Sequence, residues 1–142
     1  MHRIVTFLLL LTALGCSHVK NTSRPSTIPQ PDLNARLAHS IFFGSSSTAP
    51  ATVDVFVGNR ATVPITVRRI EVDSPGMGEY ALIRTTRAFR EVIAPGQSKT
   101  LTVFATAETT VRRPTEPLTI RAVIEFEAEG QARWREILMA RE

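Results

Sequence analysis

From about residue 37 onward, the chain is a series of short apolar runs separated by turn residues. Several runs alternate apolar and polar side chains, as a β-strand with one buried face does. Gly, Pro, Asn and Ser recur between them every 8–12 residues or so, which predicts an all-β domain, a single antiparallel β-sandwich of about seven or eight strands. The expected strands are 37–43, 52–57, 63–72, 80–83, 89–93, 99–105, 118–127 and 134–139.

The run 63–72 changes the phase of its apolar–polar alternation along its length. Its apolar side chains fall on odd positions up to Val67 and on even positions from Ile70. A period of two cannot change parity without a slip, so a β-bulge or bend is expected at the arginine pair 68–69. Pro64 lies early in the run, which favours an edge strand or the start of a strand.

The last hairpin allows a register to be predicted. A loop at 129–131 would place three pairs opposite each other: Glu127 and Arg133, Glu125 and Arg135, Phe126 and Trp134. Opposite charges then share one face and aromatic rings the other, and cross-strand pairs of both kinds stabilise a sheet. A two-residue turn at 129–130 would instead place Glu125 against Trp134, and we favour the first register.

The N-terminal residues have the pattern of a secretory signal peptide. Arg3 precedes an apolar stretch over 4–14, and the small residue Gly15 follows it. As a helix this stretch would extend only about 16 Å, at ~1.5 Å per residue. A bilayer core is about 30 Å thick, so we expect residues 1–15 to be a cleaved leader and not a membrane span.

The residues Ala13-Leu14-Gly15-Cys16 resemble the lipobox of bacterial lipoproteins, although Leu more often stands where Ala13 does. The resemblance implies cleavage before Cys16, then a diacylglyceryl thioether and usually a further acyl chain on that residue, which together give stable membrane attachment. Ser17, where an Asp would favour inner-membrane retention, implies the outer membrane. The alternative is an ordinary cleavage site that leaves a free thiol on the only cysteine in the chain.

Residues 16–36 form the predicted tether, and residues 37–142 the β-sandwich domain. The tether is polar and contains Pro25, Pro29 and Pro31, which favour an extended, flexible spacer of up to about 60 Å, at ~3.1 Å per residue. A proline-rich recognition peptide is the alternative, although these prolines do not form a clean PxxP pair.

Three features of the domain resemble immunoglobulin-like domains of bacterial envelope proteins, including the late-embryogenesis-abundant type. These are a strand over 53–59 that ends in Asn, a second strand over 64–67, and the turn Ile93-Ala94-Pro95-Gly96-Gln97-Ser98 before another strand. The resemblance implies an immunoglobulin-like fold and says little about function.

Composition narrows the function classes. The 142 residues carry a formal net charge of +4, and no basic run exceeds two residues, so we expect no nucleic-acid partner. His39 is the one histidine outside the leader and tether, and Cys16 is assigned to the lipid, so neither a catalytic constellation nor a cofactor site is expected. Asp73 and Glu79 flank the turn 74–78, and we interpret them as solvated turn residues rather than a calcium or other metal site.

Five arginines are candidates for a basic partner-binding surface: Arg84, Arg87, Arg90, Arg112 and Arg113. The alternative is that they form an ordinary solvated surface. Together with the leader, they favour a non-catalytic, lipid-anchored protein on the periplasmic face of the outer membrane that binds or assembles with another envelope component. A passive structural or stress-related lipoprotein and a carrier of a small apolar ligand are the other hypotheses.

Overall fold

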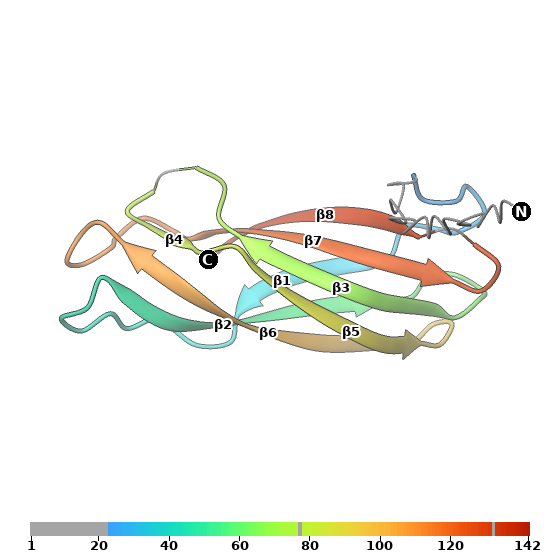
Figure 1. The fold of residues 1–142 in the computed structure, drawn as a ribbon. Helices are drawn as coiled ribbons and strands as arrows, with labels where there is room; N and C mark the ends of the chain where they lie inside the picture. The colour runs from blue at the N-terminus through green and yellow to red at the C-terminus, as the bar shows by residue number, and fades with distance from the viewer. Residues whose placement is uncertain (1–22, 77, 132) are drawn as a thin grey trace, which may run out of the picture.

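The computed structural model describes residues 23–76, 78–131 and 133–142; the predicted leader and Cys16 lie outside the described residues. This part of the chain folds into two four-stranded antiparallel sheets and contains no helix. Figure 1 labels the strands, which are β1 (Asp32–Leu37), β2 (Thr48–Gly58), β3 (Ile65–Asp73), β4 (Tyr80–Leu82), β5 (Thr85–Ile93), β6 (Ser98–Thr109), β7 (Thr119–Ala128) and β8 (Trp134–Arg141).

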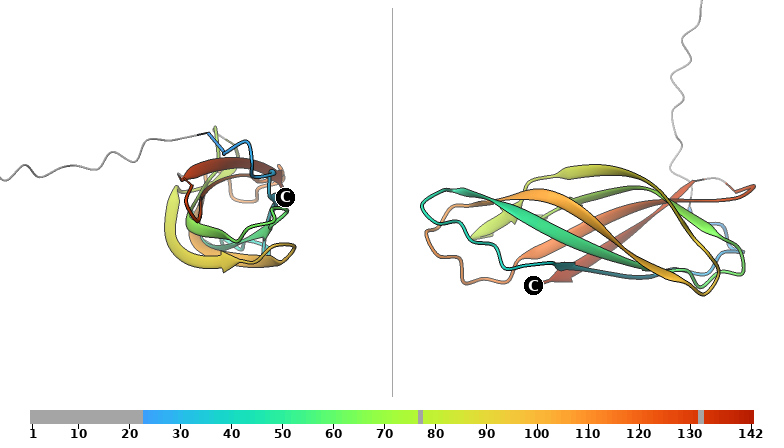
Figure 2. Two further views of the ribbon diagram at one scale, coloured as in Figure 1. Left: turned by 90° about the vertical axis from the view of Figure 1, so that its right-hand side faces the viewer. Right: turned by 90° about the horizontal axis from the view of Figure 1, so that it is seen from below.

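The two sheets have the orders β1-β2-β6-β4 and β5-β3-β7-β8. Viewed along the strands in Figure 2, they curve toward each other and enclose a common core. The predicted all-β sandwich is therefore confirmed, with eight strands in the described residues.

Alternation in the sequence becomes burial in the structure. Val53, Val55 and Val57 on β2 are fully buried, whereas Phe56 between them lies on the outer face and is 38% exposed. β7 follows the same rule, because its even positions from Ile120 to Phe126 have no exposed surface. Removing these apolar side chains from water is the main term that holds the sheets together.

The phase change in β3 is a β-bulge, as predicted. Its register shifts between Val67 and Arg69 against both neighbouring strands, β5 and β7. The extra residue at the bulge lets both Val67 and Ile70 point into the core despite their opposite parity. Pro64 immediately precedes the strand, where its missing N–H costs no ladder hydrogen bond.

The final hairpin has the favoured register. Glu125 pairs with Arg135 and Phe126 with Trp134 across β7 and β8. The two rings stack with centroids 5.5 Å apart and planes inclined by 23°. On the other face, the Arg133 Nε donates to Glu127 Oε2 at 3.0 Å.

The first strand lies earlier than predicted. Residues 37–43, expected as a strand, form a loop after Leu37, while β1 occupies the end of the predicted tether and pairs in register with 53–58 of β2. The sequence interpretation overlooked the alternation of Leu33, Ala35 and Leu37, which lies within polar, proline-containing surroundings. Ala35 is 2% exposed, and Ile28 further upstream is 4% exposed, so this stretch packs on the domain.

Asn59 joins two turns at the end of the sandwich where β2 finishes. Its side chain is buried, and its Nδ2 donates to the carbonyls of Val63 and Ile93, each at 2.9 Å, while its Oδ1 accepts from the Ala61 N–H at 2.8 Å. Its backbone exchanges hydrogen bonds with the 94–97 turn. One amide thus holds the β2–β3 connection against the β5–β6 turn.

Replacing Asn59 with Ala should lower the free energy of unfolding by about 2–4 kcal/mol, because it leaves a buried carbonyl, a buried N–H and a partly buried carbonyl without their side-chain partner. Urea unfolding of the variant and the parent measures the difference. Asn34→Ala, at an exposed position on β1, is the matched control and should change the free energy by less than about 0.5 kcal/mol. Equal effects of the two substitutions would show that Asn59 does not hold this corner.

Candidate functional site

Two connecting loops emerge at the same end of the sandwich because the strands that carry them are paired. β2 and β6 pair from Thr48 opposite Glu108 onward, and the Thr109 N–H extends the ladder to the Ser47 carbonyl at 2.8 Å. The β1–β2 loop (38–47) and the β6–β7 loop (110–118) therefore lie side by side. We call this surface the aromatic–arginine end, because it carries Phe42, Arg112 and Arg113.

The β1–β2 loop presents an aromatic side chain to solvent. A turn closed by the Ser46 N–H and the Phe43 carbonyl, 3.0 Å apart, directly follows Phe42. Phe43 packs against the core and meets the Tyr80 ring edge to face, with centroids 6.1 Å apart. Phe42 points the other way and is 87% exposed, more than any other large apolar side chain among the described residues.

The β6–β7 loop brings two cations to the same place. Arg112 and Arg113 are both exposed, and within the described residues neither forms an ion pair with an acidic side chain. With the other loop they line an open hollow of about 870 Å³, whose walls include Ile41, Phe42, Phe43, Arg112, Arg113 and Pro114. A second hollow of about 510 Å³ adjoins it and shares Ile41, Phe43 and Pro114.

Glu79, before β4, holds the β6–β7 loop in place. Its backbone carbonyl accepts from the Thr110 N–H at 3.1 Å, and its carboxylate accepts from the backbone N–H groups of Thr115 and Glu116. These two backbone hydrogen bonds keep the pKa of Glu79 below its ordinary value of 4.5. The carboxylate is therefore ionised at neutral pH and holds the loop at Thr115 and Glu116, while the backbone carbonyl of Glu79 holds the start of the loop at Thr110.

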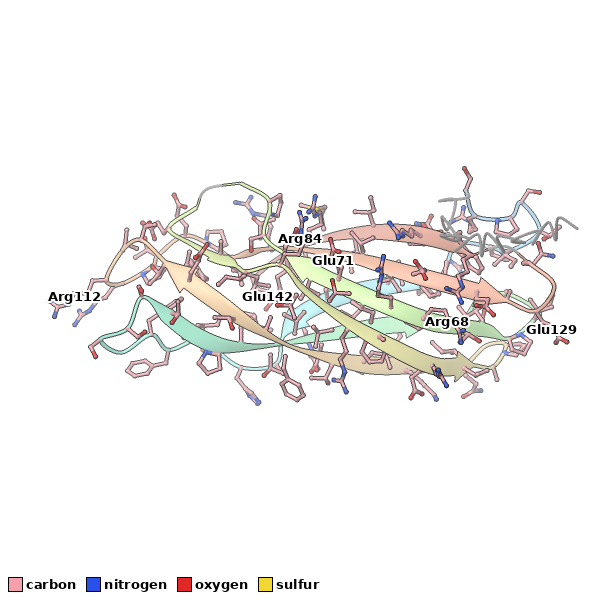
Figure 3. All side chains as sticks on the ribbon, in the orientation of Figure 1. Arg68, Glu71, Arg84, Arg112, Glu129 and Glu142 are labelled. Atoms are coloured by element: carbon pink, nitrogen blue, oxygen red, sulfur yellow. The ribbon has the colours of Figure 1, made fainter. Side chains whose placement is uncertain are left out.

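The five arginines proposed from the sequence do not form one patch. Arg112 lies at the aromatic–arginine end, whereas Arg84 lies over the middle of the sandwich, as Figure 3 shows. Arg84 pairs with Asp73 at 3.1 Å and with Glu71 at 3.5 Å. Arg90 is exposed on β5.

Arg87 has a structural role. Its Nη1 donates to the Thr102 carbonyl on β6 at 2.5 Å, and its guanidinium lies 5.0 Å from the Phe89 ring centroid and 5.8 Å from that of Phe104. Arg87 thus joins β5 of one sheet to β6 of the other. It occupies a carbonyl that an open strand edge would otherwise leave unpaired.

Asp73 is not the solvated turn residue that the sequence suggested. It is 5% exposed, because the Arg121 Nε donates to its Oδ1 at 2.7 Å and the Arg84 Nε to its Oδ2 at 3.1 Å. Burial acts to raise the pKa of Asp73, but the hydrogen bonds and charges of Arg121 and Arg84 outweigh it, so the pKa lies below 3.8. The sequence interpretation missed this ion cluster because it depends on strand register.

Other candidate chemistry is sparse in the described part of the chain. His39 lies exposed in the β1–β2 loop and lines the smaller of the two hollows. No group of three or more His, Cys, Asp or Glu side chains is placed to hold a metal ion within the described ranges. Over the same residues, no helix is long and apolar enough to cross a membrane. Cys16 lies outside these ranges.

The sequence predicts a strand at Phe42, whereas in the structure Phe42 lies in the β1–β2 loop. Phe42 and Phe43 are adjacent, and adjacent side chains of a strand point to opposite faces. In the loop they also diverge, one into the core and one into solvent. What the sequence did not show is that β2 and β6 bring Phe42 beside Arg112 and Arg113.

No protein family and no curated protein matches the chain. Among solved structures, a structural-genomics target designated SoR45 has a TM-score of 0.57 at 11% sequence identity, over 82% of this chain and 85% of that one. A protein from Archaeoglobus fulgidus has a TM-score of 0.46 at 13% identity, over 80% of this chain and 94% of that one. At this identity the likeness to SoR45 supports the fold alone.

The Asp73 cluster predicts a pH dependence of stability. Because the folded-state pKa is lowered, the stabilisation by this carboxylate is fully present above the unfolded pKa of about 3.9 and is lost as pH falls through the lower folded value. Asp73→Asn should therefore cost about 2–4 kcal/mol at pH 7. Its difference from the parent should shrink as the pH falls below about 3.9.

Urea unfolding at a series of pH values measures this difference. Asp32→Asn, whose exposed carboxylate pairs with Arg60 at 3.4 Å, is the matched control and should cost less than about 1 kcal/mol. A cost of Asp73→Asn that stayed constant down to the lowest pH would contradict the assignment.

Proposed function

We propose that this chain is a non-catalytic, lipid-anchored cell-envelope protein that binds or assembles with another envelope component through the aromatic–arginine end. The observation that most directly supports this proposal is the 87% exposed Phe42 beside Arg112 and Arg113, two cations without an acidic partner in the described residues. An exposed aromatic ring next to arginines is the composition that protein interfaces favour. A passive structural lipoprotein would have no need for such a surface.

The anchor and its location come from the sequence. The lipobox-like residues before Cys16 favour lipidation, and Ser17 favours the periplasmic face of the outer membrane. The features that resemble immunoglobulin-like and late-embryogenesis-abundant domains are part of the same proposal. A carrier of an apolar ligand is less favoured, because the side chains between the sheets pack together as one cluster.

The point where the chain enters the domain indicates which end of the sandwich would face away from the membrane. Arg24 pairs with Glu136 at 2.8 Å near the start of β8, and Ile28 is buried, so the predicted tether is already packed on the domain here. Only seven residue steps separate Ser23 from Cys16, at most about 25 Å of chain. This entry lies at the end opposite the aromatic–arginine end (Figures 1 and 3), so an anchored domain would hold that end away from its own membrane.

Energy transfer to the membrane tests this orientation. The lipidated protein is placed in vesicles that contain a headgroup-labelled acceptor lipid, with a donor dye on Glu129→Cys or on Arg112→Cys. The two sites lie at opposite ends (Figure 3), and the sheet between them has strands of up to 12 residues, roughly 40 Å. We expect clearly stronger transfer from position 129, and equal or reversed transfer would contradict the orientation.

Photo-crosslinking in the native cells tests the binding function. A photoreactive phenylalanine analogue replaces Phe42 or, as the control, Ile137, which is 67% exposed on β8. Position 42 should yield a discrete crosslinked product that position 137 does not, and Cys16→Ser should reduce it by removing the anchor. Absence of a specific product at position 42, with the protein normally localised, would favour the passive structural hypothesis.

A further inference from the structure

We infer that the aromatic–arginine end binds an extended acidic peptide segment of a partner protein, one that carries an aromatic or aliphatic side chain between its carboxylates. This inference rests on the proposed function and specifies the chemistry of its partner. Three features of the described residues lead to it: the charge of the surface, its shape and its position.

Charge at the larger hollow, which Arg112 and Arg113 line, selects for carboxylates, whereas Glu142 lines the smaller hollow. Arg112 and Arg113 are neighbours on one loop, and neither has an acidic partner within the described residues, in contrast to Arg84 and Arg121, which are paired with Asp73. A guanidinium matches a carboxylate with two parallel N–H donors, which gives both strength and direction. Glu79 holds their loop at Thr115 and Glu116, so the two cations are presented from an ordered backbone.

Shape selects for an extended chain with an apolar side chain. The two hollows, about 870 and 510 Å³, adjoin through Ile41, Phe43 and Pro114 and are open to solvent. Two adjoining open hollows suit a peptide laid across them better than an enclosed small molecule. Phe42 at its rim offers a ring that a bound apolar side chain would cover, and burying such a ring is a typical source of affinity.

The position of this surface and the pairing of β4 argue against two other modes of binding, to lipid headgroups and by strand addition. The surface faces away from the proposed anchor, which disfavours headgroups of the protein's own membrane. The nearby edge of β4 is occupied at Leu82, because the Ser74 hydroxyl accepts from the Leu82 N–H at 2.9 Å and the Ser74 N–H donates to the Leu82 carbonyl at 3.2 Å. The peptide would therefore bind through side chains and not by adding a strand to β4.

Selection from a displayed library of random 12-residue peptides tests the inference. The bait is the mature chain with Cys16→Ser, and we expect enriched sequences in which Asp or Glu flanks an aromatic or aliphatic residue. The affinity of the best peptide, synthesised and measured by calorimetry, should fall at least tenfold in Arg112→Glu/Arg113→Glu and severalfold in Phe42→Ala. Arg36→Glu/Arg90→Glu makes the same charge change at two other exposed positions and should have little effect, as should Ile137→Ala.

Several results would overturn the inference. One is an enriched set without acidic residues, or no enrichment at all; another is an equal loss of affinity in both double variants, which would indicate unspecific charge attraction. Binding to anionic vesicles that depends on Phe42 and Arg112, without peptide binding, would assign the surface to a membrane. A specific crosslink at position 42 in cells combined with a failed selection would retain the proposed function and reject this chemistry. Unchanged thermal unfolding of each variant shows that it is folded.

Discussion

The pairing of β2 with β6 is the constraint on which the other features depend. Eleven residue pairs run without a break from Thr48 opposite Glu108 to Gly58 opposite Ser98. A slip of one residue would turn the buried valines of β2 to solvent, so burial of the core fixes the register. The register in turn fixes both ends of the sandwich. At one end β2 leads into the corner held by Asn59, and at the other the two loops with Phe42 and Arg112 must emerge together.

Strand register also determines where charged side chains lie on the outer face of the second sheet, β5-β3-β7-β8. The register of β3, β7 and β8 places Glu125 between Arg69, 3.8 Å away, and Arg135, 3.4 Å away. Arg69 and Arg135 thereby acquire an acidic neighbour through the strand register. The modest net charge of +4 conceals this arrangement, in which a largely compensated sheet face contrasts with uncompensated cations at a loop end.

Local patterns in the sequence predicted the features that depend on local physics. The parity change around Arg68 required a bulge, and opposite charges with facing aromatics selected the register of the last hairpin; both have the predicted form. Features that depend on distant strands were not predictable in this way. The first strand is not evident from the sequence, because the alternation of the apolar Leu33 and Ala35 with polar residues is short and lies in a proline-containing stretch. The sequence suggests a turn residue at Asp73, because Arg121, which buries it, is 48 positions away in the chain.

The arginines show most clearly why sequence alone could not define the site. The residues next to the five candidates in the chain do not show which of them are paired: Arg84 faces Glu71 and Asp73, and Arg87 joins β5 to β6. The loop that carries Arg112 and Arg113 is also held by an acid, Glu79. That carboxylate, however, binds backbone amides rather than either guanidinium. One ionised side chain therefore holds the loop without neutralising it, and this combination leaves Arg112 and Arg113 exposed and without an acidic partner in the described residues.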